Sequence, residues 1–450
     1  MHLAAFVTAG PVSGGHGGWR HPGADRDITS LGYYTRLART LEDGCFDLVF
    51  LADILAIPDR LRGSLDSQLR YGALGALRLD PMVVLAAMCG ATSHVGLACT
   101  ISTTYFEPFA VARSLATLDH LSAGRAAWNI VTSFQEAEAR NFSRAEHVGR
   151  DVRYDRADEF MEVATALWDS WSDDALVQDP VAPLYADPAK VRRIDHDGRW
   201  FKVRGPLNVS RSPQGRPVFL QAGASDRGRD FAARWAEVVF VTHPAPDSAA
   251  AFRNDLRARA ERFGRDPDGI KVLPGIVAIA AETRTMAQER RALLEGLAHP
   301  EAGLSTLSYH LDIDLSEFPQ DEMLPEMDVP GVQGHYREVA DMTRRSGAPL
   351  REIGRRYGVG RTADGFTGTA ADIADHMEAW LAAGACDGFM LQVPYVPGGL
   401  DEFTRLVIPE LQRRGLFRRR YTGTTLREHL DLPRPGSRFP SPPSGAERAG

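Results

Sequence analysis

Short apolar runs alternate with longer amphipathic segments along most of this chain. Eight runs have the length of a strand and contain few polar residues, which is typical of strands buried on both faces. These runs lie at 2–8, 46–53, 95–103, 125–133, 217–223, 237–242, 270–281 and 388–393. Because their polar and apolar residues do not alternate, we expect a parallel sheet covered by helices on its outside.

Amphipathic segments with helical spacing follow most of these runs. They lie at 30–44, 80–92, 108–124, 153–171, 229–236, 249–264, 370–384 and 400–415. Eight strand–helix units in one chain predict an α/β fold, namely a (β/α)₈ TIM-type barrel with insertions. A doubly wound open sheet is the alternative, but no G-x-G-x-x-G turn follows any of the predicted strands.

Three stretches interrupt the repeating pattern. We expect residues 1–420 to form a single barrel domain with insertions at about 54–80, 172–216 and 299–369. The third insertion precedes the last strand–helix unit, reads as irregular, and is interpreted as a lid over the barrel mouth. Residues 421–450 are polar and rich in proline, which predicts an extended, partly disordered tail that does not pack.

Composition excludes several classes of function. The chain of 450 residues is 44% hydrophobic and 25% charged, with a net charge of −7, so neither nucleic acid nor an acidic membrane is an expected partner. The apolar runs are too short to span a bilayer, and the first ten residues read as a strand instead of a signal peptide. Four scattered cysteines suggest buried thiols in a reducing cytoplasm, and no ligand spacing for a metal occurs.

The predicted strands end on small polar side chains. Asp53 ends the second strand, Thr100 lies near the end of the third, and Asn129 lies in the fourth. Active sites of such barrels lie at the carboxyl ends of the strands. These side chains suit the binding of a polar, phosphorylated, planar molecule better than they suit nucleophilic attack, and no G-x-S-x-G turn is present.

Three motifs in order carry a resemblance to a known family. They are "RAAWNIVTS" (125–133), "RYDRADEFMEVATALWDSW" (153–171) and "QAGASDRGRDFAA" (221–233). The chain resembles flavin-dependent monooxygenases of the bacterial luciferase superfamily, in particular the nitrilotriacetate monooxygenase component A branch with its sulfone and long-chain alkane relatives. The resemblance covers nearly the whole chain apart from the tail.

This resemblance implies an activity. The expected reaction inserts one oxygen atom from O₂ into a small organic substrate through a flavin hydroperoxide. Reduced FMN (FMNH₂) would come from a separate NAD(P)H:flavin reductase. The resemblance also implies a cytoplasmic homo-oligomer, a dimer or a tetramer. A deazaflavin-dependent oxidoreductase of the same superfamily and a non-catalytic flavin-binding protein are the alternatives.

Carried over residue by residue, the family's flavin contacts fall on Asp53, Thr100, Tyr154 and Ser225, and Asn129 is a further candidate. The family has a histidine four residues before the tyrosine, where this chain has Arg150. We expect Arg150 to take over that contact, and a local shift of the chain would instead bring in His147.

The stretch from 218 to 240 contains the expected phosphate site. Its strand stops at Gly223, and Ser225 immediately precedes a helix whose free N–H groups favour an anion. With Arg227 these groups predict the binding site of the FMN phosphate, whereas the simpler interpretation makes Ser225 only a helix cap.

Two loop histidines are the candidates for catalysis. His16 lies in a glycine-rich loop after the first strand, and His310 lies in the third insertion. Either could face the substrate. The alternative is that both are simply loop residues.

Overall fold

A parallel sheet forms the centre of the protein. The computed structural model describes residues 1–11, 15–327, 329, 331, 333–359 and 366–439. The strand order is β11-β10-β9-β4-β3-β2-β1-β15-β12, with every adjacent pair parallel. Their bounds are β1 His2–Thr8, β2 Leu48–Ala52, β3 Gly96–Ser102, β4 Ala126–Val131, β9 Val218–Gln221, β10 Val238–Val239, β11 Lys271–Val272, β12 Gly275–Val277 and β15 Gly388–Gln392.

The two ends of this strand order belong to one bent strand. Only Leu273 and Pro274 separate β11, which pairs with β10, from β12, which pairs with β15. The N–H of Met390 also donates to the carbonyl of Pro274 at 2.9 Å. The sheet therefore closes on itself, and the predicted (β/α)₈ barrel is confirmed.

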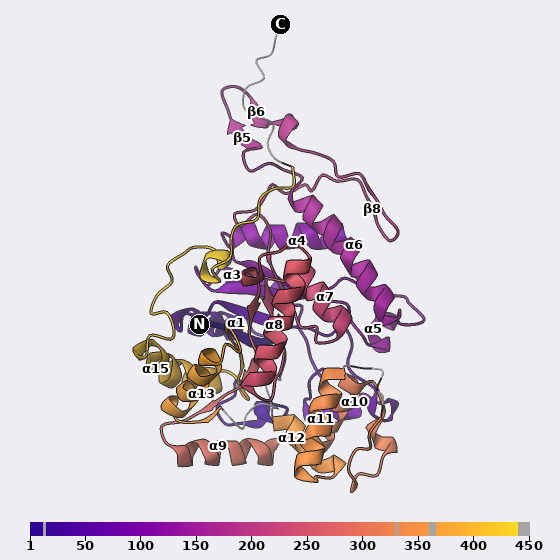
Figure 1. Cartoon of the computed structure of the whole chain (residues 1–450), viewed down its shortest axis with the longest axis vertical. Helices are drawn as coiled ribbons and strands as arrows, with labels where there is room; N and C mark the ends of the chain where they lie inside the picture. The colour runs from indigo at the N-terminus through magenta and orange to yellow at the C-terminus, as the bar shows by residue number, and fades with distance from the viewer. Residues whose placement is uncertain (12–14, 328, 330, 332, 360–365, 440–450) are drawn as a thin grey trace.

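Helices follow the strands and cover the outside of the barrel (Figure 1). They are α1 Leu31–Asp43, α3 Pro81–Cys89, α4 Pro108–Leu121, α6 Arg150–Trp168, α7 Asp226–Trp235, α8 Pro246–Arg262, α13 Ala370–Ala382, and a last helix made of α14 Gly398–Glu402, a π-helical turn Phe403–Val407 and α15 Ile408–Arg413. Local chemistry sets where they begin. Asp80 Oδ1 caps α3 by accepting from the N–H of Met82 at 2.9 Å, and Pro81 is the first helical residue.

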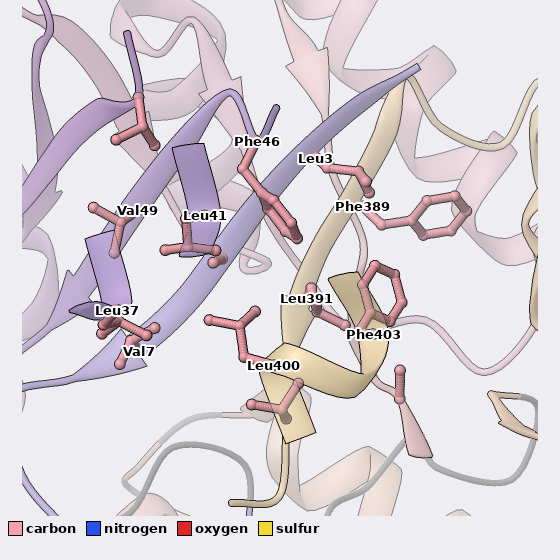
Figure 2. Packing of buried hydrophobic residues seen from close by; sticks show 14 of the residues in the cluster. Leu3, Val7, Leu37, Leu41, Phe46, Val49, Phe389, Leu391, Leu400 and Phe403 are labelled. Carbon is pink, nitrogen blue, oxygen red and sulfur yellow. The ribbon is translucent and has the colours of Figure 1, made fainter. Parts of the chain in front are cut away.

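The largest hydrophobic cluster lies between the barrel and its outer helices (Figure 2). Side chains from β1 and β15 pack against α1 and against the last helix. The residues labelled there are Leu3, Val7, Leu37, Leu41, Phe46, Val49, Phe389, Leu391, Leu400 and Phe403, all of them buried. The four cysteines are also buried, as free thiols. None of the described helices has both the length and the hydropathy needed to cross a bilayer.

The first two insertions have little regular structure. Residues 54–80 contain one short helix, α2 Asp66–Tyr71, and the loop after β4 contains another, α5 Glu136–Asn141. Residues 172–216 leave the barrel as two small antiparallel pairs at the top of Figure 1. These pairs join β5 Leu176–Asp179 to β6 Leu184–Ala186, and β7 His196–Asp197 to β8 Lys202–Val203.

The third insertion is helical, so the prediction of an irregular segment was wrong. It contains α10 Pro300–Leu311, α11 Gln333–Ser346 and α12 Leu350–Val359, and another helix, α9 Arg284–Leu297, precedes it. Leu304, Leu307 and Leu311 recur with helical spacing on α10 and pack with Ile353 and Tyr357 of α12. These helices bury a small core of their own, which the glycine and proline content of the segment concealed.

The C-terminal segment also differs from the prediction, because residues 421–439 pack. Leu426 and Leu430, in and next to the short helix α16 Leu426–His429, join the side chains that fill the interior of the barrel. Tyr421 Oη donates to the carbonyl of Phe46 at 2.7 Å. A few leucines among many polar residues are enough to anchor the segment. Residues 440–450 lie outside the described residues.

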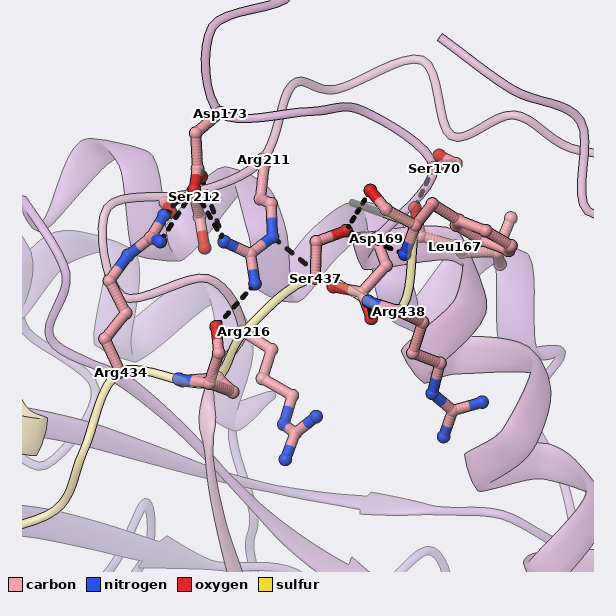
Figure 3. Close-up of polar contacts among 12 residues, drawn as sticks. Leu167, Asp169, Ser170, Asp173, Arg211, Ser212, Arg216, Arg434, Ser437 and Arg438 are labelled. Carbon is pink, nitrogen blue, oxygen red and sulfur yellow. Dashed lines mark hydrogen bonds and ion pairs between the residues drawn. The ribbon is translucent and has the colours of Figure 1, made fainter. Parts of the chain in front are cut away.

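A network of ion pairs ties this segment to the second insertion (Figure 3). Arg434 Nη1 and Arg211 Nη1 each lie 2.9 Å from a carboxylate oxygen of Asp173. Arg211 Nη2 also donates to the carbonyl of Pro435 at 2.7 Å, and the N–H of Arg438 donates to Asp169 at 3.1 Å. These contacts thus hold the C-terminal segment against the second insertion.

Candidate functional site

Polar side chains at the ends of β2, β3 and β4 lie together at the mouth of the barrel. Thr100 and Asn129 are register partners on β3 and β4, and Asn129 Nδ2 donates to Thr100 Oγ1 at 3.1 Å. Thr100 Oγ1 in turn donates to the carbonyl of Leu51 at 3.0 Å. Asn129 Oδ1 is buried and has no hydrogen-bond partner among the described residues. A buried amide oxygen without a donor indicates a ligand that carries one.

Asp53 follows β2 at the same mouth. Burial raises the pKa of its carboxyl group to about 7, and the positive charge of Arg78 opposes this shift. The mouth has an apolar floor, because the half-buried rings of Phe6 and Phe240 each lie 5.0 Å, centroid to centroid, from Phe50. The sequence did not identify this floor, which belongs to the strands themselves.

The stretch after β9 forms a tight turn into α7. Ser225 is the N-cap of this helix, and its Oγ accepts from the N–H of Gly228 at 3.1 Å. A Cβ atom on Gly223 would lie 2.9 Å from the Cα of Gly228, so the turn tolerates only glycine there. The N–H groups of Asp226 and Arg227, in the first turn of α7, have no partner within the helix.

Tyr154 of α6 faces this turn. A Cβ atom on Gly228 would lie 3.0 Å from both Tyr154 Oη and Ser225 Oγ, so the two hydroxyl groups lie close together. The tyrosine ring lies 5.5 Å, centroid to centroid, from that of Phe231. The structure therefore brings together the two residues that the motifs "RYDRADEF" and "GASDRG" contribute, although 71 positions separate Tyr154 from Ser225 in the chain.

Three arginines surround the hydroxyl group of Tyr154, and they differ in how far their charge is compensated. Arg227 lies over the tyrosine ring, but its Nη2 pairs with Asp155 at 3.1 Å and with Asp158 at 2.7 Å. Arg150 and Arg153 have no carboxylate at ion-pair distance within the described chain, and Arg153 Nε is buried without a partner. The uncompensated charge at this end therefore belongs to Arg150 and Arg153.

His147 lies in the loop between α5 and α6. Its Nδ1 lies 2.8 Å from Tyr105 Oη, and burial lowers the pKa of its imidazole to about 4. It is therefore neutral at physiological pH and cannot contribute a positive charge.

Arg150 begins α6, and its Nη2 lies 3.5 Å from the carbonyl of Gly331 in the third insertion.

The two candidate catalytic histidines lie against the third insertion. His16 is buried and packs between α10 and α12, with its Nε2 2.8 Å from Thr306 Oγ1 and its N–H bonded to the carbonyl of Gly358. His310 of α10 is half-buried, and its Nδ1 lies 2.5 Å from Tyr357 Oη. Neither is a freely exposed loop residue, and their role in catalysis stays a prediction.

Sequence reasoning missed several polar residues of the mouth. Arg78 of the first insertion, Glu138 of the loop after β4 and Tyr309 of the third insertion meet near Asp53, within electrostatic range of one another. No motif marks them. Arg153 could have been identified from the sequence, because it is the first residue of the motif "RYDRADEF".

The sequence matches the luciferase-like monooxygenase family over residues 11–386. The chain belongs to this family. It is 48% identical over 440 residues to dibenzothiophene-sulfone monooxygenase of Rhodococcus erythropolis (strain XP), covering 96% of both proteins. It is 43% identical over 442 residues to nitrilotriacetate monooxygenase component A of Aminobacter aminovorans, covering 96% of this chain and 97% of the relative.

A solved structure supports the same assignment. The crystal structure of long-chain alkane monooxygenase superposes with a TM-score of 0.87 at 37% identity, covering 96% of this chain and 95% of the other. The protein is thus an enzyme, a monooxygenase of the flavin-dependent type, and its TIM-type barrel is that of its relatives.

The residues at the mouth fit an FMN molecule. The unpaired amide oxygen of Asn129 and the apolar floor suit a planar ring system with N–H groups. The N-terminus of α7, Arg150 and Arg153 suit a phosphate group at the other end. The donors thus match the two ends of this cofactor.

These charges lead to a ranking of variants. Arg153→Gln is expected to weaken FMN binding roughly 10- to 100-fold, the cost of one charge-assisted hydrogen bond. Arg150→Ala is expected to weaken it less, because Arg150 is more exposed, and His147→Gln is expected to change it little. Fluorescence titration of FMN measures all three affinities. A larger effect of His147→Gln than of Arg150→Ala would mean that His147 occupies the position of the family's histidine.

Proposed function

We propose that this enzyme is the oxygenating half of a two-component system. It would bind FMNH₂ delivered by a separate NAD(P)H:flavin reductase and use O₂ to transfer one oxygen atom to a small organic substrate. The observation that carries the proposal is the pair of uncompensated arginines beside the N-terminus of α7, at one end of an apolar barrel mouth.

Each group of residues has a defined task in this proposal. Ser225, Arg150 and Arg153 would bind the phosphate, Tyr154 would support the turn by packing beside Ser225, and Asn129 would accept a hydrogen bond from the ring edge. The bound reduced flavin supplies the activation of O₂, and the protein supplies position and a dry environment.

The third insertion suits the exclusion of water from the mouth. Helix α10 is held over it by two long-range contacts. Gln135 Nε2 donates to the carbonyl of Tyr309 at 2.6 Å, and Gln68 Nε2 donates to Ser305 Oγ at 2.8 Å. The helix is thereby attached to the loop after β4 and to the first insertion. A cover built from three segments would keep an oxygenating centre out of contact with solvent.

Relatives support a partner but leave the substrate open. One is named as a component of its monooxygenase, and pristinamycin IIA synthase of Streptomyces pristinaespiralis is named as having two different subunits, which suggests that this enzyme also works with a second protein. The names of the relatives include a sulfone, an amino polycarboxylate and a long-chain alkane, so the family alone does not select a substrate.

The test of this proposal is the dependence on a reductase. The purified enzyme with FMN and NADH is expected to oxidise NADH at a rate no higher than the buffer control, because no dinucleotide-binding turn follows a strand in its sequence. Addition of an unrelated flavin reductase should start O₂ consumption, since free FMNH₂ is the shuttled molecule. Absorbance at the NADH band and an oxygen electrode measure the two rates.

Two controls separate this function from its alternatives. A titration with a deazaflavin cofactor in place of FMN should show weaker binding, and without substrate the consumed O₂ should appear as hydrogen peroxide. Rapid NADH oxidation without a reductase would contradict the two-component proposal. Tighter binding of the deazaflavin would favour the deazaflavin-dependent alternative.

A further inference from the structure

One half-buried arginine at the mouth lacks the partners that a guanidinium group requires. Arg78 lies in the first insertion, where the N–H of the next residue, Leu79, donates to the carbonyl of Ala9 at 2.8 Å. This bond fixes the segment beside the end of β1. Arg78 Nε and Nη1 are both buried and have no hydrogen-bond partner in the described structure. Burial of charged N–H donors without acceptors costs free energy, which indicates that a ligand supplies the missing acceptors.

Two fully buried arginines of this chain show the contacts of a purely structural role. Arg125 donates through all three of its nitrogens, to the carbonyls of Ser122, Val95 and Thr92 among others, at 2.7 to 3.0 Å. Arg427 forms a two-pronged pair with Glu237 at 2.8 and 3.1 Å. Arg78 has neither kind of contact, so it does not serve to hold the fold together.

Nearby carboxyl groups do not compensate its charge. Asp53 interacts electrostatically with Arg78, but no ion pair within 4.0 Å joins the two in the described residues. The pKa of Asp53 is raised to about 7, so that much of it is uncharged at neutral pH, whereas Arg78, with a pKa lowered to about 10, stays charged. An unmatched positive charge therefore remains at this side of the mouth.

Arg78 also adjoins an apolar pocket of about 250 Å³ at the ends of β1 and β15. Gly10 lines this pocket, and a Cβ atom on it would lie 3.5 Å from Arg78 Cδ. Trp19, Tyr33 and Tyr395 supply aromatic walls. In the sheet order, β4, β3 and β2 separate β1 from β9, the strand that leads to Ser225. The charge at Arg78 is thus distinct from the proposed phosphate site.

We propose that Arg78 binds the anionic group of the substrate, a carboxylate or a sulfur oxyanion, while the apolar part of the same molecule occupies the neighbouring pocket. This assignment rests on the proposed function, because it makes the molecule at the pocket the one that is oxygenated. A guanidinium group offers parallel N–H donors that match two oxygens of such an anion. The substrate is therefore a small, largely apolar acid.

Two probes of nearly equal shape test the assignment on the FMN-loaded enzyme. 3-Phenylpropionate carries the charge, and 3-phenylpropionamide does not. Titration followed by saturation-transfer NMR is expected to show at least about tenfold tighter binding of the acid. Arg78→Gln should remove this preference and leave the affinity for the amide unchanged, and Arg78→Lys should retain part of it. FMN affinity should stay the same in both variants.

Three results would contradict the assignment of Arg78 to the substrate. Equal binding of acid and amide by the unaltered enzyme, or a preference that survives in Arg78→Gln, would show that Arg78 does not recognise an anionic substrate. Loss of FMN affinity in Arg78→Gln would mean that the charge serves the flavin. The same titration on flavin-free protein keeps the two proposals separate. If the protein did not bind FMN but still preferred the acid through Arg78, only the proposed function would be refuted.

Discussion

Replacement of Ser225 by aspartate is expected to weaken FMN binding by at least about 100-fold and to leave the fold intact. Aspartate caps a helix as well as serine does, so α7 should still begin at the same residue. The new carboxylate would lie against the phosphate group, where two negative charges about 4 Å apart repel each other by several kcal/mol in a partly buried site. Fluorescence titration with FMN measures the loss.

Riboflavin is the matched control for this variant, because it has the same ring system and no phosphate group. Ser225→Asp should bind riboflavin as well as the unaltered enzyme does. Ser225→Ala should weaken FMN binding only a little, since it removes a hydroxyl group without adding charge. If Ser225→Asp weakened riboflavin and FMN equally, the phosphate would lie elsewhere, and the serine would be only a helix cap.

The barrel was predictable because its signal is local and is repeated. Each strand is continuously apolar, and boundaries such as Asp80–Pro81 follow from capping chemistry that a short window of sequence contains. The closure of the sheet through Leu273 and Pro274 followed from treating 270–281 as one strand. Where the core is formed within one insertion, as between α10 and α12, the same method failed, because those leucines find their partners only in the folded structure.

Some residues of the candidate site could likewise be predicted from sequence motifs, and others are recognisable only in the folded structure. Asn129, Tyr154 and Ser225 lie in motifs that the resemblance identifies, and the structure brings the hydroxyl groups of Tyr154 and Ser225 close together. Arg78 lies in a polar insertion without any motif, and only its missing partners in the folded chain reveal it. Whether the charge of Arg227 is compensated likewise depends on the tertiary structure. The sequence suggests a cation for the phosphate, and the structure shows that Asp155 and Asp158 already bind it.

The C-terminal segment illustrates how composition can mislead. Its prolines and charges are typical of disorder, yet Arg427 is one of the most deeply buried side chains of the chain. Arg427 donates to both carboxylate oxygens of Glu237, and Glu237 also accepts from the N–H of Phe219 on β9 at 3.1 Å. One ion pair therefore fastens the segment to the base of the barrel.

Removal of one member of this pair is expected to cost about 3–5 kcal/mol of the free energy of unfolding, because the other charge stays buried without its partner. Arg427→Met and Glu237→Gln should each show this loss in denaturant unfolding. The double variant should lose clearly less than the sum of the two, since no unpaired charge of this pair is left.

Arg434→Met is the matched control on the same segment. Arg434 also pairs with a carboxylate, Asp173, but its side chain is 42% exposed, against 2% for Arg427. Water already screens such a pair, so its loss should cost no more than about 1 kcal/mol. If Arg427→Met were as mild as Arg434→Met, the segment would not be held by its buried charge. The leucines that fill the barrel interior, Leu426 and Leu430, would then anchor it.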